Sequence, residues 1–173
     1  MPRLKLYSIL IGVTVLACSP GLEWREVRPE GSGAVMLFPC KPKSQTRILT
    51  LAAAGSAMTM LSCQAGDVTF ALSHAELGDP SRVALALSEL RLALAANLHA
   101  SNVRSIPFEL TGATPNSQAM RIQLAGHLPD GTPVHERAAL FVRGTRVFQV
   151  AMVGARIDEA SAKVFFESLR LTT

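Results

Sequence analysis

The chain has 173 residues, of which 49% are hydrophobic and 17% are charged, and this composition excludes an intrinsically disordered protein. Its length is enough for one domain with a substantial hydrophobic core. The formal net charge is +4, but Arg3 and Lys5 belong to an N-terminal leader, and the other basic residues nearly balance the acidic ones. No basic run indicates a nucleic-acid partner. Single cations are scattered as on an ordinary solvated surface, at Arg47, Arg82, Arg91, Arg104 and Arg121.

Residues 1–17 have the form of a secretory signal peptide, with a basic start followed by the apolar run 6–17. That run is shorter than the about 20 residues with which a helix crosses a bilayer. Val15-Leu16-Ala17-Cys18 resembles the bacterial lipobox, whose cysteine is lipidated and becomes the first residue of the mature protein. Two alternatives stay open: an uncleaved anchor, and ordinary signal-peptidase cleavage near Ser19, which Pro20 disfavours.

A lipidated Cys18 predicts a stable anchor, because two or more acyl chains hold a protein durably at a membrane whereas one chain does so only marginally. We therefore expect a lipoprotein of the cell envelope that faces the periplasm and has the membrane as its first partner. Ser19 is not the Asp that resembles an inner-membrane retention signal, which favours the outer membrane. Residues 18–32 are predicted to form a short tether and residues 33–173 a single globular domain.

The chain has three cysteines, an odd number that requires an explanation in an exported protein. Lipidation of Cys18 leaves Cys40 and Cys63, and in an oxidising compartment we expect these two to form a disulfide. In the loop-entropy model, closing this loop of about 22 residues stabilises the fold by roughly 3 kcal/mol. Two separate buried thiols are the alternative.

Alternating and apolar segments in the first half of the domain predict short strands bounded by turn residues. Trp24–Val27 is expected to be a first short strand that packs on the domain. Pro39 ends the next strand, and turns are expected at Gly55 and at Gly66-Asp67. The segments that follow Trp24–Val27 are residues 34–38, 46–51, 58–63 and 68–73.

Asp79-Pro80 is predicted to begin one long helix, since Asp caps free amides and Pro suits the first helical position. An apolar stripe then recurs at helical spacing from Val83 to Leu98. Alanines and further leucines make the helix apolar nearly all round, so we expect it to be well buried.

After the helix, residues 103–110 are predicted to form an edge strand or an irregular crossing, because they contain Pro107. Pro129-Asp130-Gly131 predicts a hairpin loop in which Gly adopts a left-handed conformation. This loop sets a register that pairs Leu124 with Glu136, Ile122 with Ala138 and Met120 with Leu140.

A second hairpin is predicted at Gly144-Thr145, between strands 136–143 and 146–153. Both faces of these strands are apolar, which indicates central strands with material packed on each side. One layer is expected to come from a C-terminal helix at residues 158–169. The overall prediction is an α+β fold, with a largely antiparallel sheet of about six to eight strands, a long middle helix and a C-terminal helix.

Two short motifs resemble those of small exported bacterial domains: Phe38-Pro39-Cys40-Lys41-Pro42 after a strand, and Phe165 to Leu171 at the end of the chain. Many such domains look like the PsbP-type α/β/α sandwich, named for an extrinsic subunit of photosystem II. The resemblance implies a fold and carries over no functional residue, because such folds host several roles.

The sequence offers few groups for chemistry, and we expect no catalytic residue, no cofactor and a non-enzymatic protein. His127 and His135 flank the Pro-Asp-Gly hairpin on one polar face and are weak candidates for a metal site, which would need a third ligand. His74 and His99 complete the histidines. Gly31-Ser32-Gly33 lacks the strand-to-helix elbow of a serine hydrolase.

Two functions are compatible with these observations. The first is a lipid-anchored interaction or assembly module with an envelope protein as partner, and the second is a small-molecule or lipid binder. The binder would require a cavity between sheet and helix, which we predict to be lined by Met58, Met60, Leu87 and Leu94. An exposed apolar patch would instead favour the interaction module.

Overall fold

The computed structural model describes residues 22–100 and 102–172, so the predicted signal peptide and Cys18 lie outside the described residues. The helical elements are a 3-10 turn η1 (Pro80–Arg82), α1 (Val83–Asn97) and α2 (Glu159–Glu167). The strands are β1 (Arg25–Val27), β2 (Ala34–Phe38), β3 (Lys43–Leu51), β4 (Ala54–Ala65), β5 (Val68–Glu76), β6 (Asn102–Pro107), β7 (Met120–His127), β8 (Pro133–Arg143), β9 (Arg146–Gly154) and β10 (Arg170–Leu171).

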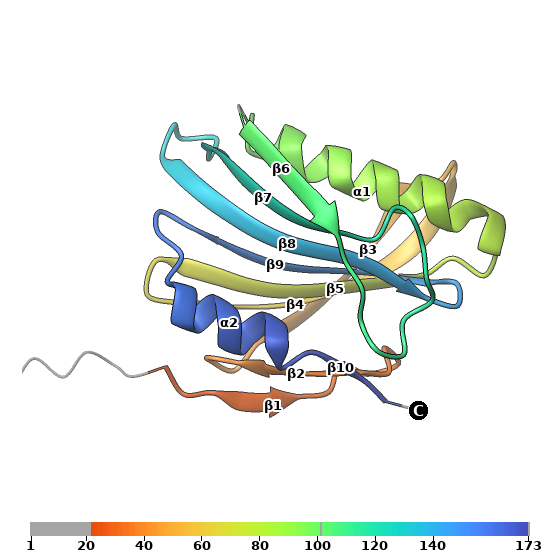
Figure 1. Cartoon of the computed structure of the whole chain (residues 1–173), viewed down its shortest axis with the longest axis horizontal. Helices are drawn as coiled ribbons and strands as arrows, with labels where there is room; N and C mark the ends of the chain where they lie inside the picture. The colour runs from red at the N-terminus through yellow and green to blue at the C-terminus, as the bar shows by residue number, and fades with distance from the viewer. Residues whose placement is uncertain (1–21, 101, 173) are drawn as a thin grey trace, which may run out of the picture.

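Seven of these strands form one antiparallel sheet in the order β3-β4-β5-β9-β8-β7-β6. Helix α1 covers one face of this sheet, whereas α2 and a small sheet of order β1-β2-β10 lie over the other face (Figure 1). The predicted α+β fold with a middle and a C-terminal helix is therefore confirmed. The small second sheet was not predicted.

The hairpin after β7 has the predicted register. Leu124 pairs with Glu136 and Ile122 with Ala138, and Gly131 adopts a positive φ of 84° in the loop between the strands. At the second predicted hairpin Arg143 pairs with Arg146. Both registers follow from local turn chemistry combined with alternating apolar residues.

The central strands β8 and β9 separate two hydrophobic cores. Leu140 and Val147 face α1, whereas Phe141 and Phe148 face α2 and the small sheet, with their rings stacked at 4.7 Å. This division confirms the prediction that these strands are apolar on both faces because both faces are covered. The ring of Phe165 on α2 is fully buried and anchors the helix over the second core.

The turn predicted at Gly55 is wrong. Gly55 is the second residue of β4 and pairs with Thr50, while the chain turns at Ala52 and Ala53, whose φ angles are 48° and 62°. Positive φ at both central residues is the geometry of a type I′ hairpin turn, which Gly and Asn adopt more readily than Ala. The turn was not predicted because its two central residues are alanines, which are not typical turn residues.

Part of the predicted tether belongs to the folded domain. β1 pairs with β2, as expected for Trp24–Val27, and the ring of Trp24 packs edge-on against Phe70 at 6.1 Å. Ser32 is fully buried: its hydroxyl donates to the carbonyl of Pro29 and accepts from the amide of Ala34. The chain is therefore held in place from about Trp24 onward.

Candidate interaction surfaces

The outward side of α1 is apolar and uncovered. Leu85 and Leu92 are 52% and 62% exposed, and Glu89 and Arg91, the charged residues of the helix, are both half-buried. None of the exposed residues of α1 carries a charge: these are Ala84, Leu85, Leu92, Ala93, Ala96 and Asn97. The prediction that α1 is well buried is thus wrong for this outer face, because helical periodicity does not report whether a second layer covers a helix.

Hydrogen bonds to the β3–β4 hairpin fix the orientation of α1. The guanidinium of Arg82, just before the helix, donates to the carbonyls of Leu51 at 2.7 Å and Leu77 at 2.9 Å. It also reaches the carbonyls of Ala52 and Ala54 and the hydroxyl of Ser56. Arg82 was expected to be one of the scattered surface cations. In the structure its hydrogen bonds join the helical segment to the sheet, so that it acts as a clamp.

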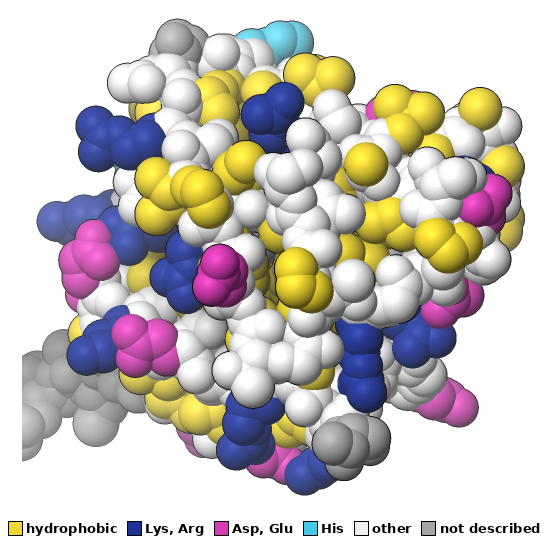
Figure 2. Space-filling view, turned by 45° about the vertical axis from the view of Figure 1, so that its right-hand side comes forward, with side chains coloured by type: hydrophobic (Ala, Val, Ile, Leu, Met, Phe, Trp, Pro, Cys, Tyr) yellow, Lys and Arg dark blue, Asp and Glu magenta, His cyan; other side chains and the backbone are white. Residues whose placement is uncertain are grey.

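Helix α1 lies on the side of the molecule opposite the small sheet that contains β1 (Figure 1). Separate hydrophobic side chains lie at the surface in the upper part of the molecule, with polar and some charged side chains between them (Figure 2). Leu85 and Leu92 are the exposed large hydrophobic residues of α1, and exposed apolar surface that forms a patch marks an interaction site in many proteins.

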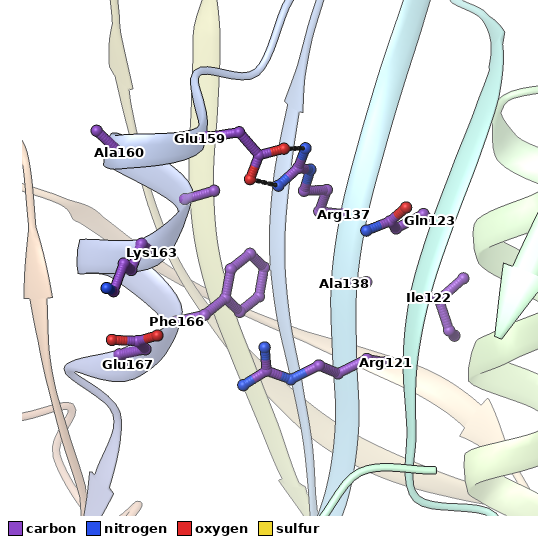
Figure 3. Close-up of a pocket in the computed structure, with 11 residues that line it drawn as sticks. Arg121, Ile122, Gln123, Arg137, Ala138, Glu159, Ala160, Lys163, Phe166 and Glu167 are labelled. Atoms are coloured by element: carbon purple, nitrogen blue, oxygen red, sulfur yellow. Dashed lines mark hydrogen bonds and ion pairs between the residues drawn. The ribbon is translucent and has the colours of Figure 1, made fainter. Parts of the chain in front are cut away.

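A groove of about 570 Å³ runs between α2 and strands β7 and β8 (Figure 3). Arg137 and Glu159 bridge it through paired hydrogen bonds between guanidinium and carboxylate. The hydrogen bonds from Arg137 hold the pKa of the Glu159 carboxyl below its ordinary value, and the same contact raises the pKa of Arg137. The fork of Arg137 is therefore already occupied by a partner within the chain.

Arg121 enters the same groove from β7, and Phe166 of α2 forms part of the opposite wall (Figure 3). The guanidinium carbon of Arg121 lies 4.9 Å from the centre of the Phe108 ring, a cation–π contact. Phe108 in turn lines a second hollow of about 980 Å³ beneath residues 107–119. The first groove is lined by one ion pair, by the further charged residues Arg121, Lys163 and Glu167, and by the ring of Phe166.

The residues predicted to line a cavity between sheet and helix line none of the three best-formed hollows in the described part of the chain. Leu87 and Leu94 are buried and pack in the core beneath α1, together with Met58. Met60 is 38% exposed on β4 and lines none of these hollows. The space assigned to a ligand is filled by side chains.

Two buried titratable groups were not singled out from the sequence. Glu136 is 5% exposed on the α1 face of β8, and burial raises the pKa of its carboxyl to about 7. His74 is 8% exposed near the ring of Phe148, and burial, followed by the charge of Arg146, lowers the pKa of His74. Among the described residues, its Nε2 has no hydrogen-bond partner. Glu136 and His74 are each a single polar residue in a largely apolar strand, and nothing in the sequence around them indicates that they are buried.

The predicted site residues fall into three groups. The Sγ atoms of Cys40 and Cys63 lie at disulfide distance, 2.03 Å apart, whereas Cys18 lies outside the described residues. His127 and His135 are exposed on neighbouring strands, on the face opposite Glu136. Across residues 22–100 and 102–172, no three His, Cys, Asp or Glu side chains lie close enough together to hold a metal ion.

No family model matches the chain, and no curated protein matches it. In the part of the chain that the structure describes, no helix is both long enough and apolar enough to cross a membrane.

Proposed function

We propose that this chain is a non-enzymatic, lipid-anchored protein of the bacterial cell envelope that docks a partner protein on the outer face of α1. One observation carries the proposal: the exposed positions of a 15-residue surface helix include two leucines and three alanines but no charged residue. Surface helices ordinarily present charged and polar residues to water. An uncovered apolar helix face of this kind is a binding surface for another protein.

The anchor defines which way this face points. With Cys18 lipidated and the domain packed from Trp24 onward, the five residues between them, which make six Cα–Cα steps, span at most about 20 Å. The small sheet then lies nearest the anchoring membrane, and α1 lies on the far side of the domain (Figure 1). The apolar face is turned away from that membrane, toward proteins of the envelope.

The same geometry argues against a second copy as the partner. Two copies that joined their α1 faces would carry their leaders at opposite ends of the pair. Tethers of about 20 Å would then have to reach one flat membrane from both ends of the pair, which a different protein as partner does not require. We therefore assign the outer face of α1 to a different protein, in which an apolar helix or strand face is the complementary surface.

Crosslinking in the native envelope tests this assignment. A photoreactive amino acid at Ala93, beside Leu92, should give one discrete adduct, whereas the same group at Val164, an exposed apolar position of α2, should not give it. Leu85→Glu combined with Leu92→Glu should remove the Ala93 adduct, because carboxylates in an apolar contact cost several kcal/mol. An adduct with the mass of two copies, or the same adduct from Val164, would contradict the proposal.

The anchor itself is tested separately. Cys18→Ser should move the protein from the membrane fraction to the soluble periplasmic fraction or leave the leader uncleaved, and should abolish incorporation of labelled palmitate. Cys40→Ser with Cys63→Ser is the matched control, because it removes two thiols and leaves the lipobox intact. Palmitate incorporation that persists without Cys18 would contradict the anchor. The resemblance to PsbP-type domains stays a prediction about the family.

A further inference from the structure

Strand β3 is uncovered along all of its length except its last residue, Leu51, which is buried. It ends the seven-stranded sheet, and its hydrogen-bonded neighbour among the described residues is β4. The eight residues from Lys43 to Thr50 are all exposed, and Ile48 reaches 73%. A strand covered on one face would show alternating burial, and a strand covered on both faces would be buried throughout. Both faces of β3 and its outer edge are therefore open to solvent.

Natural sheets protect their edges with short strands, bulges, proline or charge. The opposite edge strand β6 has six residues and ends in Pro107. β3 has nine residues and no proline, and its nine pairs with β4 run without a bulge. Its outer backbone N–H and C=O groups form a regular row that an additional strand could continue.

The charges on β3 indicate what kind of strand fits. Lys43 and Arg47 lie on the strand, and Lys41 lies just before it. Neither β3 nor β4 contains an acidic residue, and Asp and Glu are absent from Gly31 to Gly66. An incoming segment with carboxylates near Lys43 and Arg47 would gain opposite-charge cross-strand pairs.

A second copy of β3 fits this edge poorly. In an antiparallel self-pair, the two copies of Lys43 and Arg47 would bring four cations to one short ribbon that holds no carboxylate. Like charges placed on opposite strands are destabilising. The cations therefore oppose self-pairing and leave the edge available to an acidic strand.

We infer that β3 is the site at which a partner protein adds an extended, acidic segment as an eighth strand of the sheet. Backbone hydrogen bonds would supply affinity, and alternate side chains would select the partner. Carboxylates would meet Lys43 and Arg47, while an apolar or β-branched residue would cover Ile48. The inference deepens the proposed function, since it names the chemistry of one partner contact.

A synthetic peptide in which Glu and Val alternate over eight residues tests the site, with the full chain held in lipid vesicles. Amide hydrogen exchange should slow in residues 43–51 and should not slow in residues 102–107 of β6. A peptide in which Lys replaces Glu should bind about tenfold more weakly. Raising the salt concentration from 0.15 M to about 0.5 M should weaken binding of the acidic peptide and reduce its advantage over the Lys-containing peptide.

Charge reversal gives the decisive control. Lys43→Glu with Arg47→Glu should exchange the preference, so that the Lys–Val peptide protects β3 and the Glu–Val peptide does not. If this variant misfolds, the neutral pair Lys43→Gln and Arg47→Gln should bind both peptides equally. Equal protection by both peptides in the natural chain, or no protection of β3 at millimolar peptide, would overturn the inference.

A photoreactive group at Ile48 separates this inference from the proposed function. Capture of the same protein from both Ile48 and Ala93 supports both assignments. Capture from Ala93 with none from Ile48 refutes the acidic strand and leaves the α1 surface intact. Peptide protection of β3 with no capture from Ala93 refutes the α1 assignment alone.

Discussion

The carboxylate of Glu89 accepts a hydrogen bond of 2.6 Å from the backbone amide of Ala52, and so joins the middle of α1 to the tip of the β3–β4 hairpin. Ala52 is one of the two turn residues with positive φ, and Arg82 binds the carbonyls on either side of it. One acidic and one basic side chain of the helical segment therefore satisfy the backbone of a turn that has no polar side chain of its own. The position of the two proposed binding surfaces relative to each other depends on this contact.

We predict that Arg82→Met lowers the free energy of unfolding by about 3 kcal/mol, because it leaves several carbonyls of the turn without a donor. Methionine keeps most of the aliphatic length, so the change isolates the lost hydrogen bonds. Arg91→Met is the matched control and should change stability by less than about 0.5 kcal/mol. Urea denaturation measures both variants, and equal effects would show that Arg82 is not a clamp.

Leucines on opposite sides of α1 should respond differently to truncation. Leu87 is fully buried, so Leu87→Ala should cost about 3 kcal/mol in the free energy of unfolding. Leu85 is 52% exposed, so Leu85→Ala should cost less than about 1 kcal/mol. In the envelope the second variant should nevertheless weaken capture from Ala93. A large stability loss in Leu85→Ala would mean that this side chain supports the fold instead of a partner.

The sequence was sufficient to predict the parts of the fold that local chemistry determines. The loop at Pro129-Asp130-Gly131 and the alternation on either side of it predicted the pairing of Leu124 with Glu136. Apolar residues on both faces of β8 and β9 predicted layers on each side of the sheet. Turn residues and the alternation of apolar side chains are local patterns that extend over a few residues, so they can be recognised in a single sequence.

Contacts between distant segments were not predictable in this way. β10 is only two residues long, and Arg170 pairs with Val35 from the other end of the domain. The amide of Leu37 similarly donates to the hydroxyl of Ser168. No local pattern encodes such pairings. The exposure of Leu92 and Ile48 was hidden for the same reason, because hydrophobicity alone does not show whether a second layer covers a residue.

Reduction of the Cys40–Cys63 pair should destabilise the domain. The two residues are separated by 23 positions, and a bond that closes such a loop contributes roughly 3 kcal/mol in the loop-entropy model. Unfolding with and without reductant should show this difference, and Cys40→Ser with Cys63→Ser should abolish it. Two thiols that react with an alkylating agent in the unreduced, denatured protein would contradict the presence of the bond.

Glu136 should make stability depend on pH. Burial raises the pKa of its carboxyl from an ordinary 4.5 to about 7, and no hydrogen bond to the carboxylate is found within the described residues. Between these values the folded state keeps a proton that the unfolded chain has released, so stability falls as the pH rises. The expected loss between pH 4.5 and pH 8 is about 3 kcal/mol. His74, whose pKa is lowered, acts in the opposite direction, because its contribution is lost as the pH falls below 6.5.

Glu136→Gln isolates the effect of the carboxyl, since the amide has nearly the same shape and does not titrate. At pH 8 the variant should be about 3 kcal/mol more stable than the natural protein, and at pH 4.5 the two should agree within about 1 kcal/mol. Glu109→Gln, which changes an exposed side chain, should leave the pH profile unaltered. Urea denaturation at the two pH values provides the comparison. A profile that Glu136→Gln leaves unchanged would show that the carboxyl is ionised and solvated in the folded protein, contrary to its burial between Leu124 and Val153.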